Sequence, residues 1–455
     1  MRSFSYLSIC ILVSASLVSC KKYVDPGTPT NLLTVDKVYT DSLSTLGVVL
    51  SLYSKWTTNQ SNGTPVSYLC QFGAMSADDA YYFNNSQYDP YRTNTLSAGS
   101  LGNVVYTFPY QSINTANNAI AGITGSQFST SYKNQLLGEC KFWRAYAYFN
   151  LVNYFGGVPL VLGATIATNA TLPRSSTDAV YTQIVTDLKD AENLLSTTYP
   201  SAEKARVNKY AVSALLARVY LYQKNWTAAE AEATTVISSG SYSLEPNLNN
   251  VFIKTSNETI WQMVSNVSAG ITGVTAMGIN WIPSGTTPAF VLYDTLAKTF
   301  EATDQRKVNW TKSLSYNGTT FYYPYKYKIR INSVSGNEYN VMFRLAEQYL
   351  IRSEARAMQN NITGAQSDLN MVRSRAGLGN TTAATQAGLL TALEKERWVE
   401  LFTEMSDRWF NLKRTGRIDA VLSLTKPQWQ PFQALYPIPI SEITANPYLT
   451  QNPGY

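Results

Sequence analysis

The sequence contains no histidine among its 455 residues, and aspartate, glutamate, lysine and arginine together make up only 15 % of the chain. The absence of histidine excludes Ser-His-Asp and Cys-His nucleophile systems, acid–base catalysis by imidazole, and metal sites with histidine ligands. Any catalysis would therefore depend on carboxylates, lysine, tyrosine or serine.

Positive charge is too sparse for a nucleic-acid interface. The 36 lysine and arginine residues exceed the 30 acidic residues by six, and no long basic run occurs. We therefore expect no nucleic acid as a partner. Aromatic side chains are abundant instead, with 32 Tyr, 16 Phe and 9 Trp, and the hydrophobic fraction is 45 %. This composition is typical of a folded protein with a large core and excludes a disordered chain.

The amino terminus predicts export and lipidation. The apolar run from Tyr6 to Val18 is too short for a comfortable membrane span and fits the core of a signal peptide. It ends in Leu17-Val18-Ser19-Cys20, which resembles a bacterial lipobox. We therefore expect a signal peptide over residues 1–19, a lipid on Cys20 and a flexible tether over residues 20–35. An ordinary secretory cleavage near Ala15 or Ser19 is the alternative.

Two cysteines are left in the expected mature chain besides Cys20, namely Cys70 and Cys140. They could pair in an oxidising compartment. Each, however, lies in an apolar helical pattern, where cysteine commonly serves as a small core residue. We therefore favour two buried free thiols, and neither cysteine has the spacing of a metal site.

Hydrophobic periodicity predicts a mainly α-helical protein built from helix hairpins. Single helices are expected over residues 36–53 and 111–123. Three pairs of helices are then expected, namely 139–153 with 178–195, 209–222 with a helix from about Thr227, and 341–358 with a helix from Thr363. The pairs resemble degenerate tetratricopeptide-type hairpins that are separated by long irregular loops. An ordinary all-α protein is the alternative.

An irregular segment, about residues 243–331, interrupts this helical pattern. Within it, Thr259–Val264 and Tyr325–Ile329 alternate like strands among Gly, Pro, Asn and Thr. We therefore expect a single domain over residues 36–455 that carries this segment as an insert and contains a few short strands.

Several motifs occur in a fixed order along the chain. They are Gly138-Glu139 with Arg144-Ala145-Tyr146, Gly156-Gly157-Val158-Pro159-Leu160, Arg344-Leu345-Ala346-Glu347 with Glu354-Ala355, Glu396–Glu404 with Arg408–Gly416, Tyr436-Pro437-Ile438-Pro439, and the terminal Asn452-Pro453-Gly454-Tyr455. In this order they resemble the signature of the SusD/RagB family, and the lipobox agrees with that resemblance. The match extends over nearly the whole expected mature chain.

The resemblance implies both a fold and a function. SusD-like proteins have a tetratricopeptide-type helical scaffold and carry no catalytic centre or cofactor. The resemblance therefore implies a lipid-anchored protein of the outer membrane, exposed at the cell surface, that captures an oligosaccharide or another nutrient. It also implies a partner, a SusC-like TonB-dependent transporter over which the protein sits as a lid.

Sugar recognition requires flat aromatic faces for pyranose rings and polar side chains for hydroxyl groups. Two regions have this composition, residues 77–97 and the insert. We expect ligand-binding residues in both regions, namely Asp78, Tyr82, Asn84, Tyr88, Tyr91, Arg92, Trp281, Trp310, Tyr323 and Tyr325. For any single residue, a structural role at a helix end or in a small sheet is the alternative.

Two other functions stay open on the sequence. A lipoprotein glycoside hydrolase would need two carboxylates that face each other across a cleft, about 5 to 10 Å apart. Glu396, Glu400 and Glu404 repeat every four residues beside Arg397 and Arg408, which favours a ladder of ion pairs on one helix face. A repeat scaffold that binds peptides in a concave groove is the other alternative.

Overall fold

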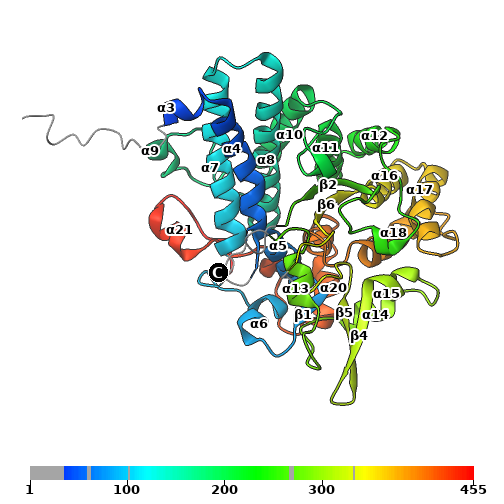
Figure 1. The fold of residues 1–455 in the computed structure, drawn as a ribbon. Coiled ribbons are helices and arrows are strands. Elements are labelled where there is room, and N and C mark those ends of the chain that lie inside the picture. Colours follow the sequence, from blue (N-terminus) through cyan, green and yellow to red (C-terminus); the bar gives the residue numbers. More distant parts are fainter. Residues whose placement is uncertain (1–34, 59–62, 101–102, 266–270, 332–333) are drawn as a thin grey trace, which may run out of the picture.

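The structure is a computed structural model, and it describes residues 35–58, 63–100, 103–265, 271–331 and 334–455 (Figure 1). The predicted signal peptide, Cys20 and nearly all of the predicted tether lie outside the described residues. In the described part of the chain, long helices dominate and the strands are short, which confirms the mainly α class.

Four long helices stand side by side in the amino-terminal half (Figure 1). They are α4 (Ser42–Thr57), α7 (Asn103–Gly125), α8 (Thr130–Phe155) and α10 (Thr177–Leu194). Three of them begin after a residue whose side chain accepts a hydrogen bond from the first turn, namely Asp41, Ser129 and Ser176. Such caps satisfy backbone N–H groups that have no partner inside the helix, and they fix where each helix starts.

The three predicted helix pairs are confirmed, because α8 packs on α10, α11 (Lys209–Tyr222) on α12 (Trp226–Ile237), and α16 (Leu345–Met358) on α17 (Ile362–Arg375). The two helices of each of the last two pairs are connected by the same kind of turn. In each, a residue with positive φ, Lys224 or Asn360, precedes an asparagine that caps the second helix. α12 therefore begins at Trp226, ahead of the predicted start. α18 (Gln386–Leu401) packs against α16 and α17.

The remaining helices connect or cover these hairpins. They are α3 (Val35–Val38), α5 (Pro65–Ser76), α6 (Asp89–Arg92), α9 (Ile166–Asn169), α13 (Ala276–Trp281), α14 (Asp294–Thr299), α15 (Gln305–Trp310), α19 (Asp407–Arg414), α20 (Ile418–Thr425) and α21 (Ile440–Ala445), with 3-10 turns η1 (Ser86–Tyr88), η2 (Ala202–Lys204), η3 (Leu248–Asn250) and η4 (Pro431–Ala434).

The described strands form three antiparallel pairs. β1 (Ala80–Tyr82) pairs with β3 (Phe290–Leu292), β2 (Thr259–Met263) with β6 (Asn340–Arg344), and β4 (Thr311–Tyr316) with β5 (Thr319–Pro324). β2 confirms one predicted strand. Residues 341–344, predicted as the start of a helix, belong to β6 instead, so that α16 begins only at Leu345.

The strand predicted over Tyr325–Ile329 is absent. The Glu338 carboxylate accepts hydrogen bonds from the backbone N–H groups of Lys328 and Ile329 at 2.6 and 3.2 Å. The Lys326 ammonium group donates to the backbone carbonyls of Glu400 and Phe402. The Glu338 side chain thus binds two backbone N–H groups that a neighbouring strand could otherwise bind, and sequence alternation does not reveal this contact.

Aromatic rings join the helices to the second strand pair. Trp261 of β2 is fully buried and makes edge-to-face contacts with rings of α4, α8 and β6, namely Tyr53, Phe142, Trp143, Tyr146 and Phe343, at centroid distances of 5.0 to 6.5 Å. Such contacts add to the free energy gained by burying the rings themselves. The insert is therefore fixed to the helical scaffold through its first strand.

The cysteines follow the prediction of buried free thiols. Cys70 and Cys140 are both free and buried. Burial raises the pKa of the Cys70 thiol to about 12 and that of Cys140 further still. Both thiols therefore stay protonated at neutral pH and serve as small core side chains.

Candidate functional site

The two regions predicted to hold ligand are brought together, although they are separated by about 200 residues in the sequence. β1, from the first region, pairs with β3 of the insert, with Ala80 opposite Leu292 and Tyr82 opposite Phe290. The backbone N–H of Phe83 extends this pairing by donating to the carbonyl of Ala289 at 2.8 Å. β3 in turn lies against β5. The labelled strands β1 and β5 lie in the lower part of the molecule in Figure 1.

The β4–β5 hairpin carries aromatic rings on one face. Its turn is Asn317-Gly318, and both residues have positive φ, 47° and 76°, as a tight two-residue hairpin turn requires. In the register, Lys312 is opposite Tyr323 and Leu314 is opposite Phe321. Because side chains alternate along a strand, Tyr316, Phe321 and Tyr323 lie on the same face.

Phe83 from the first region packs against this face. Its ring centroid lies 5.5 Å from that of Tyr316 and 5.1 Å from that of Phe321, both in edge-to-face geometry. Tyr323 makes a similar contact with Tyr325 at 6.2 Å. We call these five half-buried residues, Phe83, Tyr316, Phe321, Tyr323 and Tyr325, the aromatic surface.

Polar side chains border the aromatic surface. Asn84 follows Phe83 in a left-handed conformation, with φ of 51°, and is exposed, as are Asn85 and Asn317. Their amides can donate to and accept from sugar hydroxyls. The ammonium groups of Lys312 and Lys328 lie over the Tyr325 ring at 4.1 and 4.6 Å from its centroid. Tyr325 is therefore already engaged by two cations, whereas Phe83, Tyr316 and Phe321 have only aromatic neighbours among the described ring contacts.

Five of the ten predicted ligand-binding residues keep accessible side chains. Asn84 is exposed, and Tyr323 and Tyr325 belong to the aromatic surface. Tyr82 is half-buried between Tyr88 and Phe290 and donates a hydrogen bond to Gln71. Arg92 is half-buried, forms an ion pair with Asp89 at 2.9 Å and lies over the Tyr81 ring. The last two residues therefore flank the strand pair rather than the aromatic surface.

The other five predicted residues, Asp78, Tyr88, Tyr91, Trp281 and Trp310, are at most 7 % exposed, which favours the alternative of a structural role for them. Trp310 is fully buried, and its indole N–H donates to the carbonyl of Leu248. Tyr91 stacks on Phe72 at 4.1 Å, and Trp281 stacks on Phe290 at 4.9 Å. These rings fill the space beneath the loops, and composition alone does not separate them from rings at the surface.

Asp78 and the neighbouring Asp79 also have structural partners. The Asp78 carboxylate accepts a hydrogen bond from Thr425 and lies 3.5 Å from the Lys426 ammonium group. Asp79 accepts from the Trp398 indole at 2.6 Å and from the backbone N–H of Thr403 at 3.0 Å. Both carboxylates thus connect the end of α5 to the carboxyl-terminal helices.

The acidic repeat of α18 forms buried ion pairs, as the ladder hypothesis requires, but its partners come from other segments. Glu400 is fully buried between the guanidinium groups of Arg306, Arg344 and Arg375. Burial by itself would raise the pKa of the Glu400 carboxyl, but the three guanidiniums hold it well below its usual value. A buried carboxylate that forms ion pairs with three guanidinium groups and has no solvent access is unsuited to general acid catalysis.

The neighbouring arginines of the sequence repeat do not form the ladder. Arg397 pairs with Asp407, and Arg408 pairs with none of the three glutamates. Glu404 lies beyond the end of α18, where it binds Arg344 and Lys326. The predicted pairing within one helix face is therefore wrong. Arginine side chains from β6, α15 and α17 form the ion pairs with these carboxylates instead.

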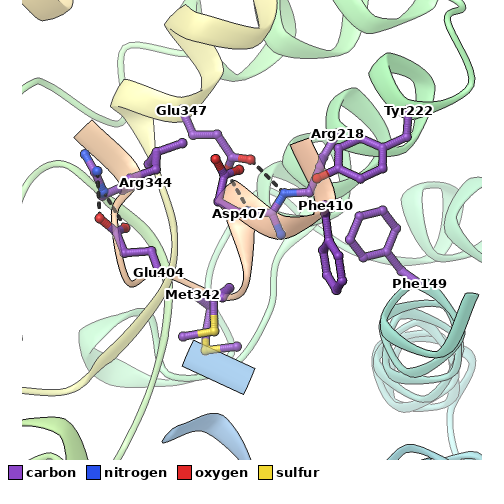
Figure 2. A pocket seen from close by; sticks show the side chains of 11 residues that line it. Phe149, Arg218, Tyr222, Met342, Arg344, Glu347, Glu404, Asp407 and Phe410 are labelled. Carbon is purple, nitrogen blue, oxygen red and sulfur yellow. Dashed lines mark hydrogen bonds and ion pairs between the residues drawn. The ribbon is translucent and has the colours of Figure 1, made fainter. Parts of the chain in front are cut away.

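A small internal cavity of about 20 Å³ lies beside this network (Figure 2). Arg218 donates to both oxygens of Glu347 at 2.7 and 2.6 Å, and Arg344 donates to Glu404. The apolar part of the cavity wall includes Phe149, Tyr222, Met342 and Phe410. This volume is about that of one water molecule, so the cavity does not accommodate a sugar.

No helix in the described ranges is long and apolar enough to span a membrane. Nor does any cluster of three or more cysteine, aspartate or glutamate side chains there offer a site for a metal ion.

Comparisons with known sequences give consistent matches. A profile described as "Starch-binding associating with outer membrane" matches residues 43–221, and the profile of the SusD family matches residues 205–455. SusD-like protein P25 of Formosa agariphila is 25 % identical over 416 residues, which cover 76 % of this chain and 78 % of that protein. SusD-like protein P2 of the same organism is 27 % identical over 431 residues, 80 % of this chain and 83 % of that protein.

Solved structures share the fold. A SusD superfamily protein from Bacteroides vulgatus matches with a TM-score of 0.80 and 21 % identity, over 92 % of this chain and 100 % of that one. A laminarin-binding SusD-like protein matches with a TM-score of 0.77 and 25 % identity, over 91 % of this chain and 99 % of that one. Because the family profile matches more than half of the sequence and its fold is the fold observed here, the chain belongs to the SusD family.

Proposed function

We propose that this protein binds a glycan on the aromatic surface, without cleaving it, as the capture component of a nutrient-uptake system in the outer membrane. The observation that carries this proposal is the cluster of half-buried rings that Phe83 and the β4–β5 hairpin build together. Rings that point away from a core and have amide groups beside them can stack on the C–H faces of pyranose rings and bind their hydroxyls.

A glucan is the first ligand to test. The structurally similar SusD-like protein described as laminarin-binding supports this choice, as does the starch-binding description of the family profile. An open surface gains little free energy per sugar ring, because the hydroxyl groups lose water when they bind. We therefore expect dissociation constants of about micromolar to millimolar.

Calorimetric titration with laminari-oligosaccharides and malto-oligosaccharides tests the proposal. Removing one stacking ring, in Phe321→Ala or Tyr323→Ala, should weaken binding by about 0.5 to 1.5 kcal/mol, the usual contribution of an aromatic contact. Tyr448→Ala is the matched control, since Tyr448 is 60 % exposed and lies near α21, away from the aromatic surface. Wild-type affinity in both hairpin variants would place the ligand elsewhere, and product analysis of the same samples shows whether sugar is released.

We further propose that the protein acts as a lid on a SusC-like TonB-dependent transporter and is held at the cell surface by a lipid on Cys20. The family profile's description of association with the outer membrane supports the location. Helical hairpins that expose broad faces offer a docking surface for a large partner. Purification from native membranes in mild detergent should recover the two proteins together. Recovery as a free monomer, with the transporter demonstrably present in the same membranes, contradicts the lid.

A further inference from the structure

A cavity of about 670 Å³ opens on the helical side of the molecule, between α12, α16, α18 and α19. Its size is within the range of about 300 to 1,000 Å³ that is usual for small-molecule sites. Six basic and two acidic side chains line it, together with the rings of Trp226 and Trp398 and the apolar side chains of Leu390 and Leu393. The cavity is therefore both partly apolar and positively charged.

Most of the cationic side chains in its wall are already paired. Arg414 donates to both oxygens of Glu354 at 2.6 Å, and Arg397 donates to Asp407 at 3.0 Å. Arg417, at the rim, donates to Glu394 at 3.1 Å. Both acidic side chains of the cavity wall, Glu354 and Glu394, are therefore engaged in ion pairs, and so is Asp407 behind the wall.

Arg408 is different. It is 5 % exposed, and its buried Nε has no hydrogen-bond partner among the described residues. Its nearest carboxylate oxygen, on Glu394, is 3.8 Å away, beyond hydrogen-bond distance, and Glu394 already accepts from Arg417. Asp79, another acidic neighbour, uses its two oxygens to accept from Trp398 and from the backbone of Thr403, while Asp78 and Asp407 are engaged by Thr425 and Arg397.

A guanidinium group has five N–H donors, and burying it without acceptors is costly. The Arg408 side chain is held in place by the Trp398 ring, whose centroid lies 3.8 Å from the guanidinium carbon. A planar cation fixed on an aromatic ring at the wall of a cavity is ready to bind an oxyanion through two parallel hydrogen bonds.

We propose that this cavity binds a small ligand that carries a carboxylate or sulfate group, with Arg408 as the residue that binds the anion. The apolar part of the wall, with Trp226 and Leu393, then packs against the body of the ligand. A uronic acid and a sulfated sugar both have the required chemistry. This site is distinct from the aromatic surface and does not depend on neutral glycans binding there.

Calorimetric titration of the purified protein with glucuronate, glucose 6-sulfate and glucose tests the proposal. The neutral sugar should not bind in this cavity, and the stronger of the two acidic sugars identifies the preferred oxyanion. Because hydrogen bonds between charged groups contribute about 1.5 to 3 kcal/mol, Arg408→Gln should weaken binding of that sugar about tenfold to a hundredfold. Arg408→Lys should recover part of the loss, because it restores the charge without the planar pair of donors.

A second variant keeps the test decisive if Arg408→Gln does not fold. Glu394→Gln removes the carboxylate that competes for Arg408, so it should strengthen binding of the acidic sugar several-fold. Arg330→Gln, at an exposed arginine outside the cavity, is the matched control and should leave the affinity unchanged. The proposal is overturned if the wild type binds neither acidic sugar, if a folded Arg408→Gln binds as well as the wild type, or if Glu394→Gln weakens binding.

Discussion

Replacing Glu400 by glutamine should show whether the acidic repeat of α18 is structural. Its two oxygens contact Arg306 at 2.8 Å and the guanidiniums of Arg344 and Arg375, and none of these side chains is exposed by more than a few per cent. Removing one partner from a buried ion pair costs about 3 to 5 kcal/mol. Glu258 still neutralises Arg344 and Arg375 in the variant. We therefore expect Glu400→Gln to lower the free energy of unfolding by the smaller amount, about 3 kcal/mol.

Urea unfolding followed by tryptophan fluorescence measures this change. Asp294→Asn is the matched control, because Asp294 pairs with Lys298 at 3.4 Å while both side chains are about 80 % exposed. Such surface pairs contribute about 0 to 1 kcal/mol. The glycan affinity of Glu400→Gln should equal that of the wild type. Unchanged stability, or loss of a sugar-releasing activity in this variant, refutes the structural role and restores the hydrolase hypothesis.

Three further predictions concern stability and location. Hydrogen bonds from Arg373 and Lys395 hold the pKa of Glu301 at about 2, below its usual 4.5, so its contribution to stability is present above pH 4.5 and is lost towards pH 2. Glu301→Gln should therefore reduce the loss of stability on acid titration between those values. Trp261→Ala should cost about 3 to 5 kcal/mol in urea unfolding, because it removes a fully buried ring with five aromatic neighbours. Cys20→Ala should move the protein from the outer-membrane fraction to the soluble envelope fraction, and unchanged fractionation contradicts lipidation.

Periodicity predicted the helix hairpins well, because their contacts are local in sequence. The pairs α11–α12 and α16–α17 each bury an apolar stripe against the next helix, and such stripes recur at helical spacing. The prediction failed where a side chain from a distant segment decides the backbone conformation. Glu338 binds backbone N–H groups of the segment predicted as a strand, and β6 pairs with β2 where the start of α16 was predicted.

For the candidate site, too, the sequence predicted local features but not the contacts between distant segments. Aromatic composition indicated two candidate regions, and the structure brings them together through β1 and β3. Composition did not show which rings fill the space beneath the loops, so the buried Trp310 and Tyr91 were predicted as ligand-binding residues. Tyr316 and Phe321 were missed, although the Asn317-Gly318 turn between alternating strands signals the hairpin that presents them. Arg408 was noticed only as a neighbour of the acidic repeat.

Because Phe83 and the β4–β5 hairpin come from distant parts of the sequence, the aromatic surface exists only after the chain has closed a loop of more than 200 residues. Local helix hairpins can form earlier, since short loops close quickly and at little entropic cost. A partly folded chain can thus hold its helices and still lack the aromatic surface. Ligand that binds this surface selects the fully closed chain, so amide hydrogens of β1, β3 and β5 should gain protection from exchange when glycan is added.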